Sequence, residues 1–455
     1  MAGTSAADAR PNPYLTGINA PMDRECTLTQ LRVSGTLPRS LDGQYLRIGP
    51  NPLRPPASAA AHHWFLGDGM VHGIRLSGGQ ALSYRNRWIR SRAVSRALGE
   101  PDAPGPRRRG DNVNTNVIGH AGRTWALVEA GAYPVELDAT LGTRAHNPFD
   151  GTLRGGFSAH PHRDPGTGEL HAICYDFGDE QTLHHVVVDA TGRVIREEPI
   201  RVSNGPSVHD CMITASTVVV LDLPVTFSRP ALAAGHAFAF AWNPDHPARV
   251  GLLGREAPGD SVVWCEVDPC YVFHPCNAWD LPDGRVVMDV VAHGTMFEHD
   301  RQGPISATAH FERWIIDPGA RRVTREVIDA SPQEFPRPDE RFIGRPYRHA
   351  WAASLCFDTG AFLGGSCLIH HDLQAGIRRV HDFGAGRHVG EFVFEPRHPG
   401  AAEGDGWLMG LVVDALHDTT DFVILDAQDI TASPQAVVHL PHRVPPGFHG
   451  NWVAA

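Results

Sequence analysis

Short apolar runs separated by turn residues recur along most of the chain. Val, Ile and Leu gather in residues 183–188 and 194–202, for example, and the turn 189–193 (Asp-Ala-Thr-Gly-Arg) lies between them. Asp-Gly and Pro-Gly pairs supply the positive-φ positions that tight hairpins need. No helical periodicity extends beyond about twelve residues. The pattern therefore predicts an all-β protein made of consecutive antiparallel hairpins.

No linker divides this series of hairpins. The Pro/Ala/Gly-rich stretches 54–61 and 100–110 are each short enough to be a loop. A β-propeller of four-stranded blades accommodates many short strands without a domain break, because radial closure leaves few exposed edges. Two stacked β-sandwiches are the competing arrangement. We expect residues 13–455 to form one β-propeller domain after a flexible tail, residues 1–12; seven blades would average about 65 residues each.

Composition and charge exclude several function classes. All 40 basic residues are Arg, because the sequence contains no Lys, and so Schiff-base catalysis, pyridoxal-phosphate anchoring and phosphate-loop lysines are excluded. A formal net charge of −11 gives no electrostatic footprint for nucleic acid. The N-terminus is small and polar, unlike a signal peptide, and no stretch reaches the roughly 18 apolar residues of a membrane helix. We expect a cytoplasmic protein with no nucleic-acid partner.

Histidine is unusually frequent, and the 27 His residues point to metal binding or proton transfer. They are too many for spacing alone to select ligands, so local context must. Four single His residues lie in unusual surroundings: His160 in Ser-Ala-His-Pro, His209 in Ser-Val-His-Asp-Cys, His274 in Val-Phe-His-Pro-Cys and His449 in Pro-Gly-Phe-His-Gly-Asn-Trp.

The eight Cys residues form no C-x-x-C pair, and we expect them to be reduced. A zinc cluster of Cys265, Cys270, His274 and Cys276 is an alternative use of His274, although its spacing matches no standard zinc finger.

At the four His segments the sequence resembles the carotenoid cleavage oxygenase family, which includes apocarotenoid oxygenases, lignostilbene dioxygenases and the retinoid isomerase of the eye. The resemblance spans nearly the whole chain and also rests on residues 12–17, 33–38, 41–52 and 64–72. It implies a seven-bladed β-propeller with loops forming a cap over an axial non-haem ferrous ion, Fe2+. The implied ligands are His160, His209, His274 and His449, whose gaps of 49, 65 and 175 residues correspond to about one, one and three blades.

The resemblance implies further residues around the ion. Three Glu residues that accept the second N–H of the ligand imidazoles match Glu129, Glu334 and Glu391. Glu395 is the alternative to Glu391, but the two lie about 13 Å apart along a strand at roughly 3.3 Å per residue, so only one reaches the ligands. Thr115 matches a small side chain that limits access to one open iron position; the alternative is a β-branched residue that fills a strand.

The implied reaction is oxidative cleavage of a carbon–carbon double bond in a conjugated chain by O2. An apolar tunnel must position the substrate, and we expect Phe65, Val128 and Phe273 to line it. Val128 precedes Glu129, where lignostilbene dioxygenases carry a Lys that engages a phenolic hydroxyl. An apolar side chain there favours a carotenoid or apocarotenoid substrate. A stilbenoid-cleaving dioxygenase, a non-cleaving isomerase or binding propeller, and a zinc hydrolase are the alternatives.

Carotenoids reside in membranes, so we also expect peripheral membrane contact. Residues 227–242 contain Leu232, Phe238, Phe240 and Trp242 among small residues. They form either an exposed apolar patch around a tunnel mouth or a buried strand pair.

Overall fold

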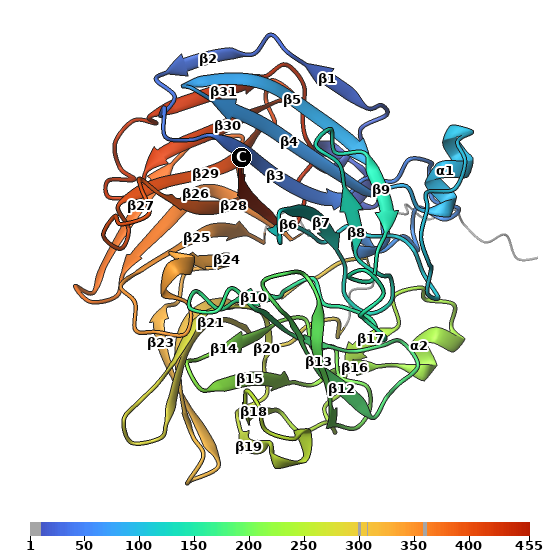
Figure 1. Ribbon diagram of the computed structural model, residues 1–455, viewed down its shortest axis with the longest axis vertical. Coiled ribbons are helices and arrows are strands. Elements are labelled where there is room, and N and C mark those ends of the chain that lie inside the picture. The colour runs from blue at the N-terminus through green and yellow to red at the C-terminus, as the bar shows by residue number, and fades with distance from the viewer. Residues whose placement is uncertain (1–10, 299–301, 307, 358–361) are drawn as a thin grey trace, which may run out of the picture.

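The computed structural model describes residues 11–298, 302–306, 308–357 and 362–455. Strands account for nearly all of the regular secondary structure in this part of the chain, and they are arranged in a ring of seven blades (Figure 1). The predicted all-β propeller is therefore confirmed. Of the two layouts that the hairpin pattern allowed, the closed ring is the one that leaves few strand edges exposed.

The first three blades hold the N-terminal half of the ring together with the last strand. Blade 1 contains β1 (Cys26–Leu28), β5 (Gln80–Trp88), β4 (Gly69–Ser77), β3 (Gly43–Pro50) and β32 (Gly450–Ala454). Blade 2 contains β6 (Asn116–His120), β7 (Arg123–Leu127), β8 (Val135–Leu137) and β9 (Thr143–His146). Blade 3 contains β10 (His162–Arg163), β11 (Leu170–Cys174), β12 (Thr182–Val188) and β13 (Val194–Arg201).

Blades 4 and 5 are joined into one sheet by a single parallel pair, Glu266 with Arg322. Blade 4 contains β14 (Cys211–Ile213), β15 (Thr217–Asp222), β18 (Arg249–Gly254) and β19 (Val263–Glu266). Blade 5 contains β20 (Tyr271–Asp280), β21 (Val286–His293), β22 (Ala309–Asp317) and β23 (Arg322–Asp329).

The last two blades complete the ring. Blade 6 contains β24 (Gln333–Pro338), β25 (His349–Cys356), β26 (Leu363–Asp372) and β27 (Ile377–Asp382). Blade 7 contains β28 (Arg387–Pro396), β29 (Gly406–Asp414), β30 (Thr419–Asp426), β31 (Ala436–Leu440) and β2 (Arg32–Gly35).

Elements outside the blades are short. The strand pair β16 (Val225–Phe227) and β17 (Phe240–Trp242) flanks α2 (Arg229–Ala233), and α1 (Arg92–Leu98) follows β5. The 3-10 turns are η1 (Pro13–Leu15), η2 (Gly17–Asn19), η3 (Trp64–Leu66), η4 (Gly259–Ser261) and η5 (Glu340–Phe342). No helix among the described residues has the length and apolar character needed to cross a bilayer.

Turn chemistry explains the hairpins that the sequence predicts. Asp189 follows β12, and its carboxylate accepts hydrogen bonds from the backbone N–H groups of Thr191 and Arg193. Gly192 adopts a φ of 83°, which a residue with a side chain rarely takes. The chain is thereby reversed into β13, and Asp and Gly act as the sequence predicts.

Both ends of the described chain close the ring. The C-terminal β32 pairs with β3 in blade 1, and the N-terminal β2 pairs with β31 in blade 7. Asn12, at the end of the predicted tail, is 3% exposed, and its amide donates to the carbonyls of Ala59 and His62. Residues 1–10 of that tail lie outside the described residues.

The inner edges of the blades meet around the centre of the ring. Each of blades 2 to 7 contributes its first strand to this inner edge, namely β6, β10, β14, β20, β24 and β28, and β32 takes the place in blade 1. Residues at or just before these strands therefore face the same axial space, although they are far apart in sequence.

Candidate metal centre

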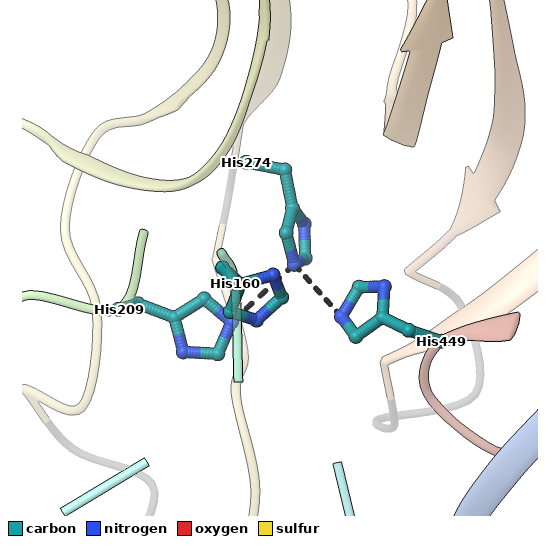
Figure 2. A group of neighbouring side chains, drawn as sticks. All are labelled: His160, His209, His274 and His449. Atoms are coloured by element: carbon teal, nitrogen blue, oxygen red, sulfur yellow. Dashed lines mark hydrogen bonds between the residues drawn. The ribbon is translucent and has the colours of Figure 1, made fainter. Parts of the chain in front are cut away.

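Four His side chains from four blades meet on the axis. His160 and His209 lie two residues before β10 and β14, His449 directly precedes β32, and His274 lies within β20. Their ligand atoms are all within 4.8 Å of one another, and each residue is between 4% and 7% exposed. Figure 2 shows the four imidazoles turned toward a common centre. The structure thus brings together the His residues that the sequence singles out.

Irregularities in the inner strands aim several of the predicted side chains. The pairing of β20 with β21 shifts register between Val272 and Pro275, where His274 lies. β24 shifts between Glu334 and Arg337, and β28 between Val389 and Phe392, which places Glu391 at the shift. An extra residue in one strand interrupts the alternation of side chains between the two faces of the sheet and changes the direction of a side chain. Such bulges are common next to functional sites.

Three carboxylates hold three of the four imidazoles. Nδ1 of His209 lies 3.0 Å from Oε1 of Glu129, Nδ1 of His274 lies 2.6 Å from Oε2 of Glu334, and Nδ1 of His449 lies 3.1 Å from Oε1 of Glu391. A carboxylate only accepts, so each Nδ1 carries the proton and donates it. The Nε2 atom of each of these rings is then left with a lone pair that points toward the axis.

A second donor supports each of the two fully buried carboxylates. His293 donates through Nε2 to Oε1 of Glu334, and Arg337 donates to Oε1 of Glu391. Burial alone would raise the pKa of Glu391, but Arg337 and His449 outweigh it and lower the pKa to about 2. The pKa of Glu334 is likewise lowered against the effect of burial, by His274 and His293. Both carboxylates are therefore ionised at neutral pH.

Glu395, the alternative to Glu391, lies elsewhere. Its charged neighbours are Glu340, Arg341 and Asp339, and burial raises its pKa to about 7. Of the two Glu residues on β28, Glu391 is the one whose carboxylate contacts His449.

The spacing of the imidazole nitrogens fits a divalent transition metal ion. Nε2 of His274 lies 3.3 Å from Nε2 of His209 and 3.1 Å from Nε2 of His449. Nitrogen ligands about 2.1 Å from an ion and at right angles to each other are about 3.0 Å apart. Nε2 of His160 is buried with no hydrogen-bond partner in the described part of the chain. Lone pairs this close repel one another, and a cation among them removes that cost.

An apolar cavity of about 560 Å³ reaches this cluster. His209, His274 and His449 line it together with the three residues predicted for a substrate tunnel, Phe65, Val128 and Phe273. Its volume lies within the range of small-molecule sites, roughly 300–1,000 Å³. Thr115 also lines it, with its hydroxyl donating to Asn114 and its carbonyl accepting from the N–H of His449.

Sequence reasoning missed several aromatic residues of the cavity. Phe335 stacks on His274 with ring centroids 5.3 Å apart, and its φ of 55° is the left-handed conformation that the β24 irregularity requires. The ring of Phe448 packs edge-on against that of Phe65, with ring centroids 5.5 Å apart. Both residues are direct sequence neighbours of predicted site residues, Glu334 and His449, and that adjacency was the available signal. The remaining aromatic lining residues are Trp64, Tyr175, Phe177, Phe238, Phe240 and Phe362.

Residues 227–242 form a strand pair beside the cavity. β16 pairs with β17, Phe240 is 2% exposed, and Phe238 stacks on His63 with centroids 4.0 Å apart. Phe238 and Phe240 both line the cavity. The alternative of an exposed patch is wrong for Phe240, whereas Phe238 is half-buried. Leu232, on α2, is 54% exposed.

The groups of three or more potential ligands that lie together in the described residues are the four His residues and a second set, His162, Asp210 and Cys211. Cys265, Cys270 and Cys276 belong to neither group, so the zinc cluster considered from the sequence is not formed. These three thiols are buried, and burial raises their pKa values.

Comparison with known proteins identifies the family to which a chain with this arrangement belongs. Residues 19–454 match the family model described as "Retinal pigment epithelial membrane protein". The carotenoid cleavage oxygenase of Mycobacterium tuberculosis is 41% identical over 99% of both chains. The chain belongs to the carotenoid cleavage oxygenase family.

Solved structures of an apocarotenoid oxygenase and a lignostilbene dioxygenase share the fold of this member of the carotenoid cleavage oxygenase family. The lignostilbene dioxygenase of Pseudomonas brassicacearum has a TM-score of 0.88 and 28% identity, covering 97% of this chain and 98% of that one. The cobalt-substituted apocarotenoid oxygenase of Synechocystis has a TM-score of 0.84 and 26% identity, covering 96% and 97%. The resemblance that the sequence motifs carried is thereby confirmed.

Proposed function

We propose that this protein is a non-haem iron(II) dioxygenase that cleaves a carbon–carbon double bond of a carotenoid or apocarotenoid to give two carbonyl products. The observation that carries the proposal is the aromatic-lined cavity that ends at the four imidazoles. One oxygen atom of O2 goes to each carbon of the broken bond. Family membership supports the same chemistry.

The proposed roles of the residues follow from their contacts. His160, His209, His274 and His449 would hold the ion through Nε2, while Glu129, Glu334 and Glu391 fix three of the rings and offset the charge. Bound ferrous iron supplies the binding and activation of dioxygen. The aromatic cavity is lined by His209, His274 and His449, so substrate and dioxygen would reach a bound ion from that side.

The shape of the cavity selects which double bond of the substrate is cleaved. Aromatic side chains exclude water and hold an extended conjugated chain by its faces, so that its position along the cavity decides which double bond lies next to the His cluster. Thr115 lines the cavity, where its side chain would narrow the space beside that cluster. Each of these residues acts by position and shape, and none needs to exchange a proton.

Cleavage of a stilbenoid is the second candidate, because the chain also matches a lignostilbene dioxygenase. Against it stands Val128, which lines the cavity as an apolar wall, in a chain that has no Lys to engage a phenol. A binding propeller, an isomerase or a zinc hydrolase would consume no oxygen.

The test is to incubate the iron-loaded protein under air with β-apo-carotenals and, separately, with resveratrol. We expect oxygen uptake coupled to new aldehydes from the apocarotenals, identified by mass spectrometry. Rapid cleavage of resveratrol alone would establish the second candidate. Isomerised or unchanged apocarotenals with no oxygen uptake would contradict a dioxygenase of either kind.

A further inference from the structure

One of the four imidazoles lacks the support that the other three have. His209, His274 and His449 each place Nδ1 within 3.1 Å of a Glu oxygen. Nδ1 of His160 has a carboxylate oxygen at 3.8 Å, Oδ2 of Asp210. That distance is too long for a direct hydrogen bond and suitable for a contact through one water molecule.

Asp210 is firmly placed next to His160. It directly follows His209 and is 4% exposed. Its Oδ1 accepts two hydrogen bonds, from Nε2 of His162 at 2.7 Å and from the N–H of Cys211 at 2.6 Å. His162 lies in β10 and Cys211 in β14, so the carboxylate joins two neighbouring blades. With Oδ1 committed to these donors, Oδ2 is the oxygen on the side of His160.

A second, polar cavity gives this contact room for water. It has a volume of about 190 Å³ and is lined by His160, His162 and Asp210 together with His274 and His449. The aromatic cavity also touches His274 and His449, so the His cluster separates an apolar space from a polar one. Water that bridges two protein groups is held best where several polar groups surround it, as here.

We propose that Asp210 is the positioning residue of His160, the fourth carboxylate of the metal centre. It accepts the Nδ1 proton of His160 through one water in the polar cavity, and thereby turns Nε2 toward the axis. His162 acts one step further out by holding Asp210. The inference rests on the proposed metal site and adds to it a partner for the one ring that the three Glu residues leave unsupported.

Asp210→Asn tests the role, with cobalt(II) as the probe and no substrate present. If the amide oxygen keeps the two donors that Oδ1 now accepts, its NH2 group replaces Oδ2, and the bridging water loses the acceptor to which it donates. The water then no longer links Nδ1–H of His160 to a carboxylate. We expect cobalt binding about tenfold weaker or worse, as for other partners of metal-ligating His residues, and a changed ligand-field absorption spectrum. Asp210→Glu restores the charge and should recover part of the affinity, and His162→Gln should have a smaller effect than Asp210→Asn.

The matched control is Asp421→Asn, because Asp421 accepts a 2.7 Å hydrogen bond from Nδ1 of His439 in blade 7, on strands away from the inner edge. It should leave cobalt affinity and spectrum unchanged. The melting temperature of each metal-free variant shows whether it is folded.

Three results would overturn the inference or separate it from the proposed site. A folded Asp210→Asn protein with wild-type cobalt affinity and spectrum overturns the role of Asp210 and leaves the four-His site intact. A wild-type protein that binds no cobalt at all overturns the site itself. A second cobalt ion that is lost in Asp210→Asn while the first is retained assigns Asp210 to a separate site with His162 and Cys211, and also overturns the inference.

Discussion

At the candidate metal centre, the position of a residue along its strand decides whether its side chain reaches a His ligand. Glu391 and Glu395 lie on one strand four residues apart, yet only Glu391 contacts His449. The sequence could propose both, because alternation along a strand puts them on the same face. It could also propose the four His residues, because motif context distinguished them from the other His residues. It could not predict that Phe335 stacks on His274, because that contact depends on a left-handed backbone conformation for which the sequence has no motif.

Glu391→Gln should weaken iron(II) binding about 10- to 100-fold. The amide keeps the size of the side chain but removes the charge that Nδ1 of His449 and Arg337 both contact. Iron affinity measured by competition with a chelator provides the readout. Glu395→Gln is the matched control on the same strand and should bind iron like the wild type; equal losses in both variants would contradict the assigned difference.

At the scale of elements, the hairpins were predictable and the irregularities were not. Turns with a glycine at positive φ, Gly192 and Gly284, mark where β12 meets β13 and where β20 meets β21. The register shifts in β20, β24 and β28 have no comparable signature, since they depend on the neighbouring strand as much as on the local residues. The same limit explains residues 227–242, whose composition suits an exposed patch and a strand pair equally well.

Close packing of one inner segment gives an element-scale prediction. Gly69, at the start of β4, lies so near the segment that leads to Thr115 that a methyl group would overlap the backbone carbonyl of Val113. We expect Gly69→Ala to lower the free energy of unfolding by about 1–3 kcal/mol and to slow substrate turnover, because Thr115 and the N–H of His449 move with that segment. Urea denaturation measures the first effect. Gly400→Ala meets only ordinary contact and should be neutral; equal stability of the two variants would contradict the packing.

For the whole molecule, buried neutral imidazoles outside the metal centre make stability depend on pH. Burial lowers the pKa of His171 and His371 to about 4 and that of His185 and His370 to about 3. In the unfolded chain these groups have a pKa of about 6.5. The unfolded state therefore binds more protons than the folded state at pH values between the folded and unfolded pKa values. The free energy of unfolding therefore falls as the pH falls from about 6.5 toward 4, by up to about 1.4 kcal/mol per pH unit for each group.

Urea denaturation at pH 7.5, 6 and 5 checks this dependence. The midpoint should fall with pH in the wild type and fall less steeply in His185→Gln, which removes one of the depressed groups. A midpoint that stays constant from pH 7.5 to 5 would show that these rings do not titrate as their burial implies.

The ring as a whole explains why distant segments make one site. β32 returns the C-terminus to blade 1 and brings His449 beside three His residues that precede it by 175 residues or more. The gaps between the motifs were compatible with blades of similar length, so the sequence could predict this convergence once a propeller was assumed. Closure by both chain ends fixes blade 1 against blade 7 and thereby holds His449 in place beside the other three His residues.

The central claim is that iron is held by these four His residues, and the most direct test is the metal content of protein purified without oxygen. Wild-type protein should contain iron equimolar with the chain, and folded His209→Ala protein should contain none. Equimolar iron in His209→Ala, or zinc in place of iron in the wild type, would contradict the account.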